Sequence, residues 1–190
     1  MFGSARRAVW QSLGLSLVVL WAWCGGIASA QTNSFPPVEF PFDLSAPSTV
    51  EATISIREKR PYHFDLNFSY ANASEQSKVR KLAGGSARLA DGKFAEPGAT
   101  VPIHLRILAA TAGSAPKVVY EADVETQGHY SNVSRSVAGG DYYYARAISS
   151  VTLEPGSYRV QARSQTAHPE FSGIRTDFSV TYDPRFIPDK

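Results

Sequence analysis

The chain has 190 residues, of which 19 are Lys or Arg, 17 are Asp or Glu and one is cysteine. A formal charge of only +2 argues against nucleic acid as a partner, because binding to phosphates requires an excess of basic residues. A single cysteine excludes an intramolecular disulfide, so the fold has to be held together by its apolar core.

Residues 1–30 are expected to form a signal peptide that is removed on export. Arg6 and Arg7 precede an apolar stretch that is too short for a comfortable membrane span, LGLSLVVLWAW. Ala28 and Ala30 then fit the small-residue positions of a cleavage site. The exported chain, 31–190, has no expected membrane span, no cysteine and as many basic as acidic residues. Because small secreted eukaryotic domains usually contain disulfides, the sequence favours a periplasmic or secreted bacterial protein.

The exported chain is expected to begin with a lead-in and to contain one domain. Residues 31–48 are rich in proline and lack periodicity, which predicts an extended segment packed on a sheet edge through Phe40 and Phe42. The domain is expected at 49–183 and is followed by a short tail, 184–190.

Alternation of apolar and polar residues predicts half-buried strands along the domain. These strands are expected at 50–57, 62–70, 101–107, 118–124, 129–137, 142–153, 158–163 and 174–180. One short helix is predicted at 72–83, capped by Asn72 or Ser74 and ended by Gly84. Seven or eight strands with one apolar face each require two stacked sheets. The predicted fold class is therefore all-β, an antiparallel β-sandwich of the immunoglobulin-like kind.

The stretch YYYARAISSVTL contains the aromatic side chains that are candidates for binding. In an unbroken strand its small and apolar residues share the core face, so Tyr143 points inward while Tyr142, Tyr144 and Arg146 point outward. On the next strand, Arg163 points outward in the same way. Exposed tyrosines beside arginine suit a protein-binding hot spot, and their rings also stack on sugars or cations. The alternative is that tyrosine favours strands and only covers the sheet.

The stretch LEPGSYRV connects two of the predicted strands. The spacing of Leu153 and Tyr158 is that of a chain crossing between sheets, with the tyrosine hydroxyl bonded to the upstream backbone. A tight hairpin is the alternative, but type II Pro-Gly turns twist against a simple hairpin. The motif resembles immunoglobulin-like sandwich domains, and the whole chain looks like the uncharacterised secreted β-sandwich domains of Gram-negative bacteria. The resemblance implies the fold and assigns no catalytic residues.

The most site-like connection is the loop SQTAHPEFSGIRT, 164–176. Loops at the end of a sandwich commonly carry recognition, and His168, Glu170 and Phe171 lie at the tip of this one. A phenylalanine in a polar tip suits binding, and it can equally fold back over the core.

Catalytic chemistry has little support in the sequence. No nucleophile motif, zinc-ligand spacing or phosphate-binding loop occurs, so neither a metal nor another cofactor is expected. His63 and His104 would meet near Asp65 only if their strands were neighbours. A hydrolase site would require a cleft that gathers Glu121, Asp123 and a histidine.

Glu121 and Asp123 also belong to an acidic row that ends at Glu125 on one outward strand face. Such a row is usually solvated and protects a sheet edge, and it can alternatively dock a basic partner.

The sequence therefore predicts an exported, non-catalytic binding protein of the bacterial envelope, such as an inhibitor, an immunity-type protein or an accessory module. Its partner would be another protein, bound by the outward face of Tyr142, Tyr144 and Arg146, by the 164–176 loop, or by both. A carbohydrate-binding module is the alternative, with the same tyrosines as a stacking platform. All three tryptophans lie in the predicted signal peptide, which counts against that alternative.

Overall fold

A computed structural model describes residues 28–110, 113, 115–134 and 142–183. The predicted tail, 184–190, and all but the end of the predicted signal peptide lie outside these residues. Within the described part of the chain, no helix is long and apolar enough to cross a membrane.

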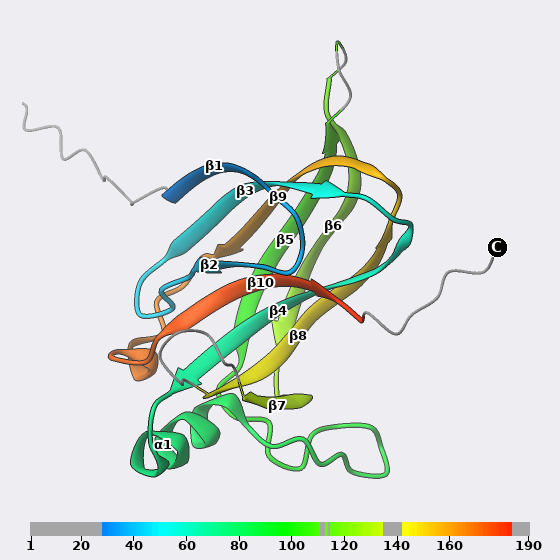
Figure 1. The fold of residues 1–190 in the computed structure, drawn as a ribbon. Coiled ribbons are helices and arrows are strands. Elements are labelled where there is room, and N and C mark those ends of the chain that lie inside the picture. Colours follow the sequence, from blue (N-terminus) through cyan, green and yellow to red (C-terminus); the bar gives the residue numbers. More distant parts are fainter. Residues whose placement is uncertain (1–27, 111–112, 114, 135–141, 184–190) are drawn as a thin grey trace, which may run out of the picture.

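Two five-stranded sheets stack face to face and form a β-sandwich (Figure 1). The first sheet has the order β1 (Ala28–Ser34), β3 (Ser48–Ile56), β9 (Gly156–Ser164), β5 (Val101–Ala110), β6 (Lys117–Thr126). The second has the order β2 (Val38–Pro41), β10 (Thr176–Tyr182), β4 (Arg60–Tyr70), β8 (Tyr142–Leu153), β7 (Ser131–Ser134). All pairings are antiparallel except that of β1 with β3. The predicted all-β sandwich is confirmed, with eight strands from β3 to β10.

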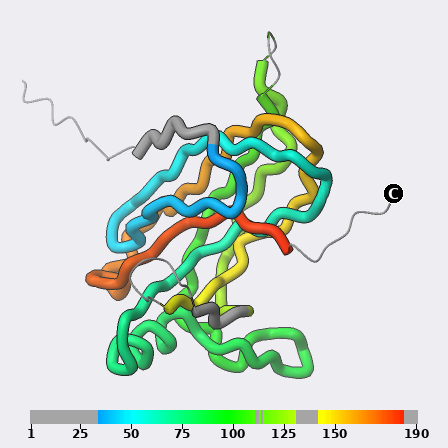
Figure 2. Tube along the Cα trace, viewed as in Figure 1, coloured from blue at the N-terminus to red at the C-terminus, as the bar shows by residue number. Residues whose placement is uncertain are grey.

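The lead-in supplies the two further strands, one at the edge of each sheet. β2 pairs with β10, and Figure 2 shows this blue N-terminal segment beside the red C-terminal strand. Phe40 and Phe42 of this edge segment are buried in the core. β1 begins at Ala28, before the predicted cleavage position after Ala30, and pairs with β3.

The core lies between the sheets and follows the predicted alternation. In β3 and β5 the residues at every second position are buried, and the same holds for the apolar positions of β4. The largest buried side chains are mainly phenylalanine, leucine and isoleucine. Each fully buried side chain of this size contributes about 1.5–3 kcal/mol to folding, so these alternating rows are the main source of stability.

The single α-helix, α1 (Ala73–Ala83), lies across one end of the sandwich (Figure 1). The Asn72 side chain accepts a hydrogen bond from the Glu75 backbone N–H at 3.0 Å, and Glu75 in turn accepts one from the Ala71 N–H at 2.9 Å. Gly84, with φ +84°, ends the helix. Its missing side chain is required, because a Cβ there would lie 2.5 Å from the Glu96 carbonyl oxygen. The predicted helix is therefore confirmed with Asn72 as its cap.

A β-bulge in β8 reverses the faces predicted for the tyrosine stretch. Phe64 of β4 pairs with Ser149 and Asp65 pairs with Ala147, which leaves Ile148 as an extra residue. An extra residue shifts the alternation by one position. Leu153, beyond the bulge, faces the core as predicted, whereas before the bulge the inward residues are Tyr144 and Arg146.

The connection from β8 to β9 crosses between the sheets, as the sequence favoured. The Tyr158 hydroxyl donates a hydrogen bond to the Glu154 carbonyl at 2.9 Å. The neighbouring crossing from β3 to β4 repeats this arrangement, since the Tyr62 hydroxyl donates to the Glu58 carbonyl at 3.0 Å. A tyrosine hydroxyl bonded to the backbone just upstream is called a tyrosine corner, and it is the feature that this fold shares with immunoglobulin-like domains.

Candidate recognition surface at the helical end

The predicted site residues occupy three different environments. Tyr142 is exposed, at 46% of its maximum, and Arg163 is exposed on the outer face of the first sheet. Tyr144 and Arg146 are 3% and 0% exposed, so the prediction that they face outward is wrong. The physical reason is the bulge at Ile148, which the strand alternation does not reveal.

The 164–176 loop is likewise split between surface and core. Phe171 is 1% exposed and stacks on Phe68 with ring centroids 5.3 Å apart, so it folds back over the core and is unavailable for binding. His168 is half-buried and lies 3.3 Å from the carboxylate of Glu170, which is exposed. Lys78 of α1 donates to the Ser172 carbonyl at 3.4 Å. The loop therefore packs on the same end of the sandwich as the helix, and this end is called the helical end below.

Arg146 is the structural centre of the helical end. All five of its N–H groups donate to backbone carbonyl oxygens at 2.7–3.3 Å, and its guanidinium carbon lies 5.0 Å from the centroid of the Phe68 ring. The acceptors belong to Leu82, Ala83, Ala99, Thr126 and Gly128. Burial lowers the pKa of Arg146 to about 10, so the side chain stays charged at neutral pH.

The charge of Arg146 is accommodated by these carbonyls. Leu82 and Ala83 end α1, where the last carbonyls of a helix lack partners within the helix and carry partial negative charge. The same guanidinium joins the helix to the segment before β5 and to the turn after β6. Arg146 thus fixes three connections that are distant in sequence, which is a structural role rather than recognition.

The tyrosines form a ladder of rings that runs inward from the surface. The ring of Tyr142 stacks on that of Tyr70 with centroids 5.7 Å apart, and the ring of Tyr70 lies 5.1 Å from that of Tyr144. Tyr144 then contacts His129 at 4.6 Å. The Nδ1 atom of His129 lies 2.6 Å from the Gly84 carbonyl, and because a carbonyl only accepts, Nδ1 carries the proton. Only the outer end of this ladder is available to a partner.

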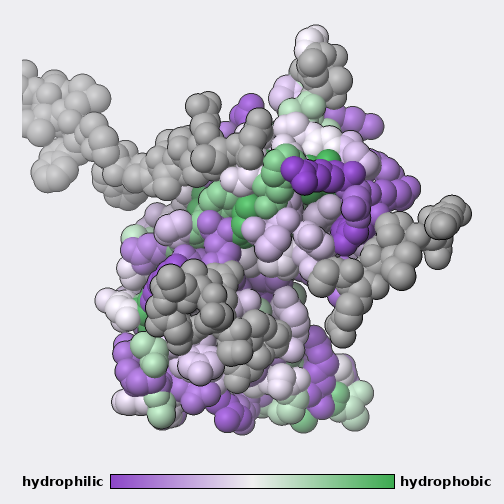
Figure 3. All heavy atoms as spheres, viewed as in Figure 1, coloured by the Kyte–Doolittle hydropathy of each residue, from purple (hydrophilic) through white to green (hydrophobic). Residues whose placement is uncertain are grey.

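The segment 85–97 forms an arm that extends from the helical end (Figure 1). Its two sides are joined by backbone hydrogen bonds, among them Leu89 N–H to the Lys93 carbonyl at 2.8 Å. The Arg88 guanidinium stacks over the Phe94 ring at 4.0 Å. Leu89 is 54% exposed, and Figure 3 shows apolar and hydrophilic residues side by side on the arm.

A groove of ≈310 Å³ separates the arm from the turn between β6 and β7. One wall carries Arg88, Lys93 and Phe94, and the other carries Gln127 and Tyr130, which is 52% exposed. Its size is at the lower limit of ligand pockets. Phe94 also contacts Gly128, where a Cβ would lie 2.3 Å from the ring. The arm is therefore seated against the turn.

Tyr130 links the groove to a buried carboxylate on the outer face of the second sheet. Its hydroxyl donates to Asp65 Oδ2 at 2.9 Å, and Asp65 is 2% exposed. Burial raises the pKa of Asp65 to about 7, although the hydrogen bond from Tyr130 lowers it. The same hydrogen bond holds Tyr130 against the sheet and fixes the position of its ring in the groove wall.

The acidic row lies on the outer face of the first sheet and is largely paired. His104 stands between Glu121 and Asp123, with ring nitrogens 3.2 and 2.9 Å from the two carboxylates, and Arg106 lies 3.4 Å from Glu121. The strand of His63 belongs to the other sheet, so the condition under which His63 and His104 would meet is not fulfilled. Among the described residues, no three His, Cys, Asp or Glu side chains are arranged to hold a metal ion.

Comparison with known proteins places the chain in a family. Residues 39–182 match the model of a family described as a domain of unknown function, DUF5625. The chain belongs to this family. A solved crystal structure from Sulfurospirillum deleyianum is similar over 78% of this chain and 98% of its own, with a TM-score of 0.60 and 22% identity. At that identity the likeness shows the fold alone. No curated protein matches the sequence.

Proposed function

We propose that this DUF5625 domain is an exported, non-catalytic binding protein of the bacterial envelope that recognises another protein through its helical end. The observation that carries the proposal is the seated arm, which holds a groove open between the Phe94 and Tyr130 rings. A surface that is already in place loses little conformational entropy on binding, which favours affinity.

The composition of this end fits protein recognition. Tyr130, Tyr142 and Leu89 are exposed there, and tyrosine and arginine are enriched among the residues that dominate binding energy. Arg88, Lys93 and Glu125 line the groove and supply charges of both signs at its rim, which suits orientation of a partner.

A non-catalytic role is supported by the environment of the acidic groups. Asp65 has the raised pKa that a general acid or base requires, but it lies behind Tyr130 and is closed to a substrate. Glu121 and Asp123 share His104 on an open sheet face, where water reaches them.

The test is capture of a partner with tagged protein from envelope and culture extracts, followed by identification and purification of what is captured. A Leu89→Ser/Tyr142→Ser variant removes exposed apolar side chains from the helical end. The matched control, Val118→Ser/Val119→Ser, removes equally exposed side chains from β6 at the opposite end. We expect affinity for the purified partner to fall about tenfold or more in the first variant and to stay unchanged in the control.

Equal loss in both variants, or no loss in either, would refute the helical end as the recognition surface. A glycan-binding module is the second candidate, because the groove places Phe94 and Tyr130 beside polar groups such as Gln127. Retention on glycan or peptidoglycan beads that is lost in Tyr130→Ala would favour this candidate over a protein partner.

A further inference from the structure

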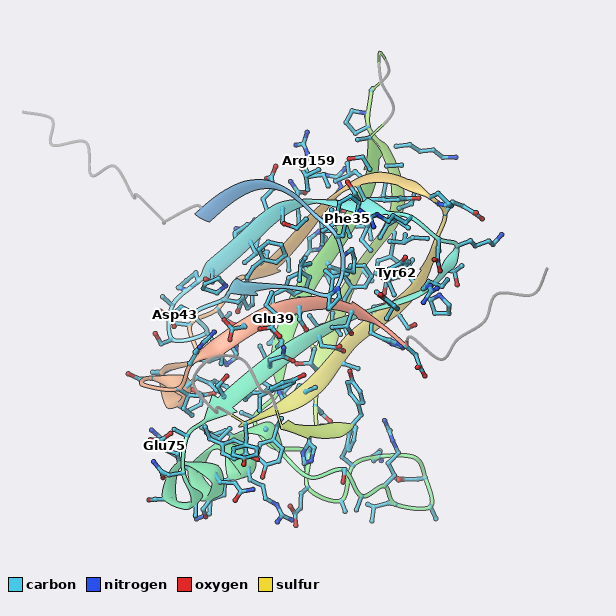
Figure 4. All side chains as sticks on the ribbon, in the orientation of Figure 1. Phe35, Glu39, Asp43, Tyr62, Glu75 and Arg159 are labelled. Atoms are coloured by element: carbon cyan, nitrogen blue, oxygen red, sulfur yellow. The ribbon has the colours of Figure 1, made fainter. Side chains whose placement is uncertain are left out.

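A second pocket lies at the other end of β4, away from the helical end. Its volume is ≈180 Å³, and three segments line it: the turn between β1 and β2, the crossing from β3 to β4 with the start of β4, and the end of β10. The lining side chains are mainly aromatic and charged: Phe35, Arg57, Glu58, Arg60, Tyr62 and Tyr182. Figure 4 labels Phe35, in the turn between β1 and β2, and Tyr62, near the start of β4.

Both arginines of this pocket are held by aromatic rings. The Arg57 guanidinium lies 3.7 Å from the Phe35 ring centroid, and the Arg60 guanidinium lies 4.6 Å from that of Tyr182. Tyr182 in turn packs edge-on against Tyr62 with centroids 5.9 Å apart. Stacking of this kind restricts the guanidinium planes and leaves their N–H edges free to bind.

The arginines have more hydrogen-bonding capacity than the described residues satisfy. Arg60 forms an ion pair with Glu58, but its Nε atom is buried and has no acceptor among the described residues. Arg57 is exposed and pairs with none of the described carboxylates. A buried donor without an acceptor is unfavourable, so the Arg60 guanidinium is not fully satisfied by its pairing with Glu58. The N–H groups of the exposed Arg57 can donate to an acceptor in the pocket, and the Arg60 Nε–H close by reports on the charge of that acceptor.

We propose that this pocket binds a carboxylate group. Two guanidinium groups face one carboxylate, so the lining carries a single excess positive charge, which matches a carboxylate better than a doubly charged phosphate. The N–H edge of a guanidinium also matches the planar geometry of a carboxylate. The volume admits a small group and is below that of a pocket for a drug-sized ligand. This site is independent of the helical end.

The carboxylate could belong to a peptide or to an acidic sugar, and a titration distinguishes these sources. Isotope-labelled protein is titrated at fixed pH with N-acetylglycine, glucuronate, N-acetylglycine amide and inorganic phosphate, and the Arg60 Nε–H signal is followed by NMR. We expect saturable shifts with one or both carboxylates, with dissociation constants on the order of millimolar, and none with the amide. The tighter of the two carboxylates identifies the source.

Arg57→Gln should weaken binding about tenfold, because it removes one of the two cations without disturbing the core. Arg159→Gln is the matched control, since Arg159 is an exposed arginine of the same outer surface that pairs with Glu51. The proposal is overturned if the Arg60 signal does not move, if the amide or phosphate binds as tightly as the carboxylates, or if the two variants behave alike.

Discussion

Replacement of Arg146 by lysine tests whether the buried guanidinium holds the helical end together. Lysine keeps the positive charge and most of the side-chain length, but its ammonium group has three donors where the guanidinium has five. At least two of the five carbonyl oxygens that Arg146 now satisfies would lose their donor.

The expected cost follows from these lost hydrogen bonds. A buried polar group left without a partner costs about 1–3 kcal/mol. The Leu82 carbonyl keeps its hydrogen bond from the Ala99 N–H, so one or two carbonyls are left without a donor and the expected cost is about 1–6 kcal/mol. The stacking of the guanidinium over Phe68 is lost as well. A domain is stable by only about 5–15 kcal/mol, so Arg146→Lys should lower the urea midpoint markedly.

The assay is urea unfolding of the wild type, Arg146→Lys and Arg163→Lys, with hydrogen exchange to locate the change. Arg163 is an exposed arginine on a strand, and the same substitution there should stay within about 0.5 kcal/mol of the wild type. In Arg146→Lys, hydrogen exchange at the amides of the arm should be faster than in the wild type. Exchange at the amides of β3 should change less. A free energy of unfolding within about 1 kcal/mol of the wild type would refute the assigned role of Arg146.

Three further predictions concern single side chains. Because the pKa of Asp65 is raised to about 7, the folded protein binds a proton that the unfolded chain releases near pH 4. The contribution of Asp65 to stability is therefore fully present below about pH 4 and is lost as the pH rises from about 4 to about 7. Asp65→Asn should remove this loss in urea titrations; His63, Glu39 and Asp177 are the other titratable groups on these strands and are unchanged in the variant. Gly98→Ala should cost about 2 kcal/mol or more, because a Cβ would lie 2.3 Å from the Leu82 carbonyl, whereas Gly92→Ala, at a similar φ in open space, should cost about 1 kcal/mol; equal costs would contradict the contact. Tyr158→Phe removes the hydroxyl bond to Glu154 and should cost about 1 kcal/mol by the same assay, with an unchanged midpoint as the contrary result.

Features that depend on short stretches of sequence were predicted correctly. The alternation in 50–57 and 62–70 placed the right residues in the core, because side chains of a strand point to opposite faces whatever their tertiary neighbours. Asn72 and Gly84 marked the ends of the helix, since capping involves only adjacent residues. The spacing of Leu153 and Tyr158 indicated the crossing between sheets for the same reason.

The candidate surfaces were less accessible to prediction, because they depend on segments that are distant in sequence. Arginine is rarely buried, and nothing near Arg146 shows that five carbonyls from other connections surround it. The groove beside Tyr130 could not be predicted from the sequence, because the arm that forms one of its walls has no strand or helix periodicity. The cluster of Arg57 and Arg60 carried a local signal in its consecutive charges, but the rings that stack on the two guanidinium groups, Phe35 and Tyr182, come from segments distant in sequence.

The sequence by itself determined which residues form strands, where the helix begins and ends, and that two sheets must stack, because these properties follow from local periodicity and the need to bury apolar faces. Only the tertiary structure decided which way the tyrosines point. One extra residue at Ile148 is accommodated by the pairing of β8 with β4, and it turns Tyr144 and Arg146 from the predicted surface into the core. The pairing register of a strand is set by its neighbours, and that information is absent from the strand's own sequence.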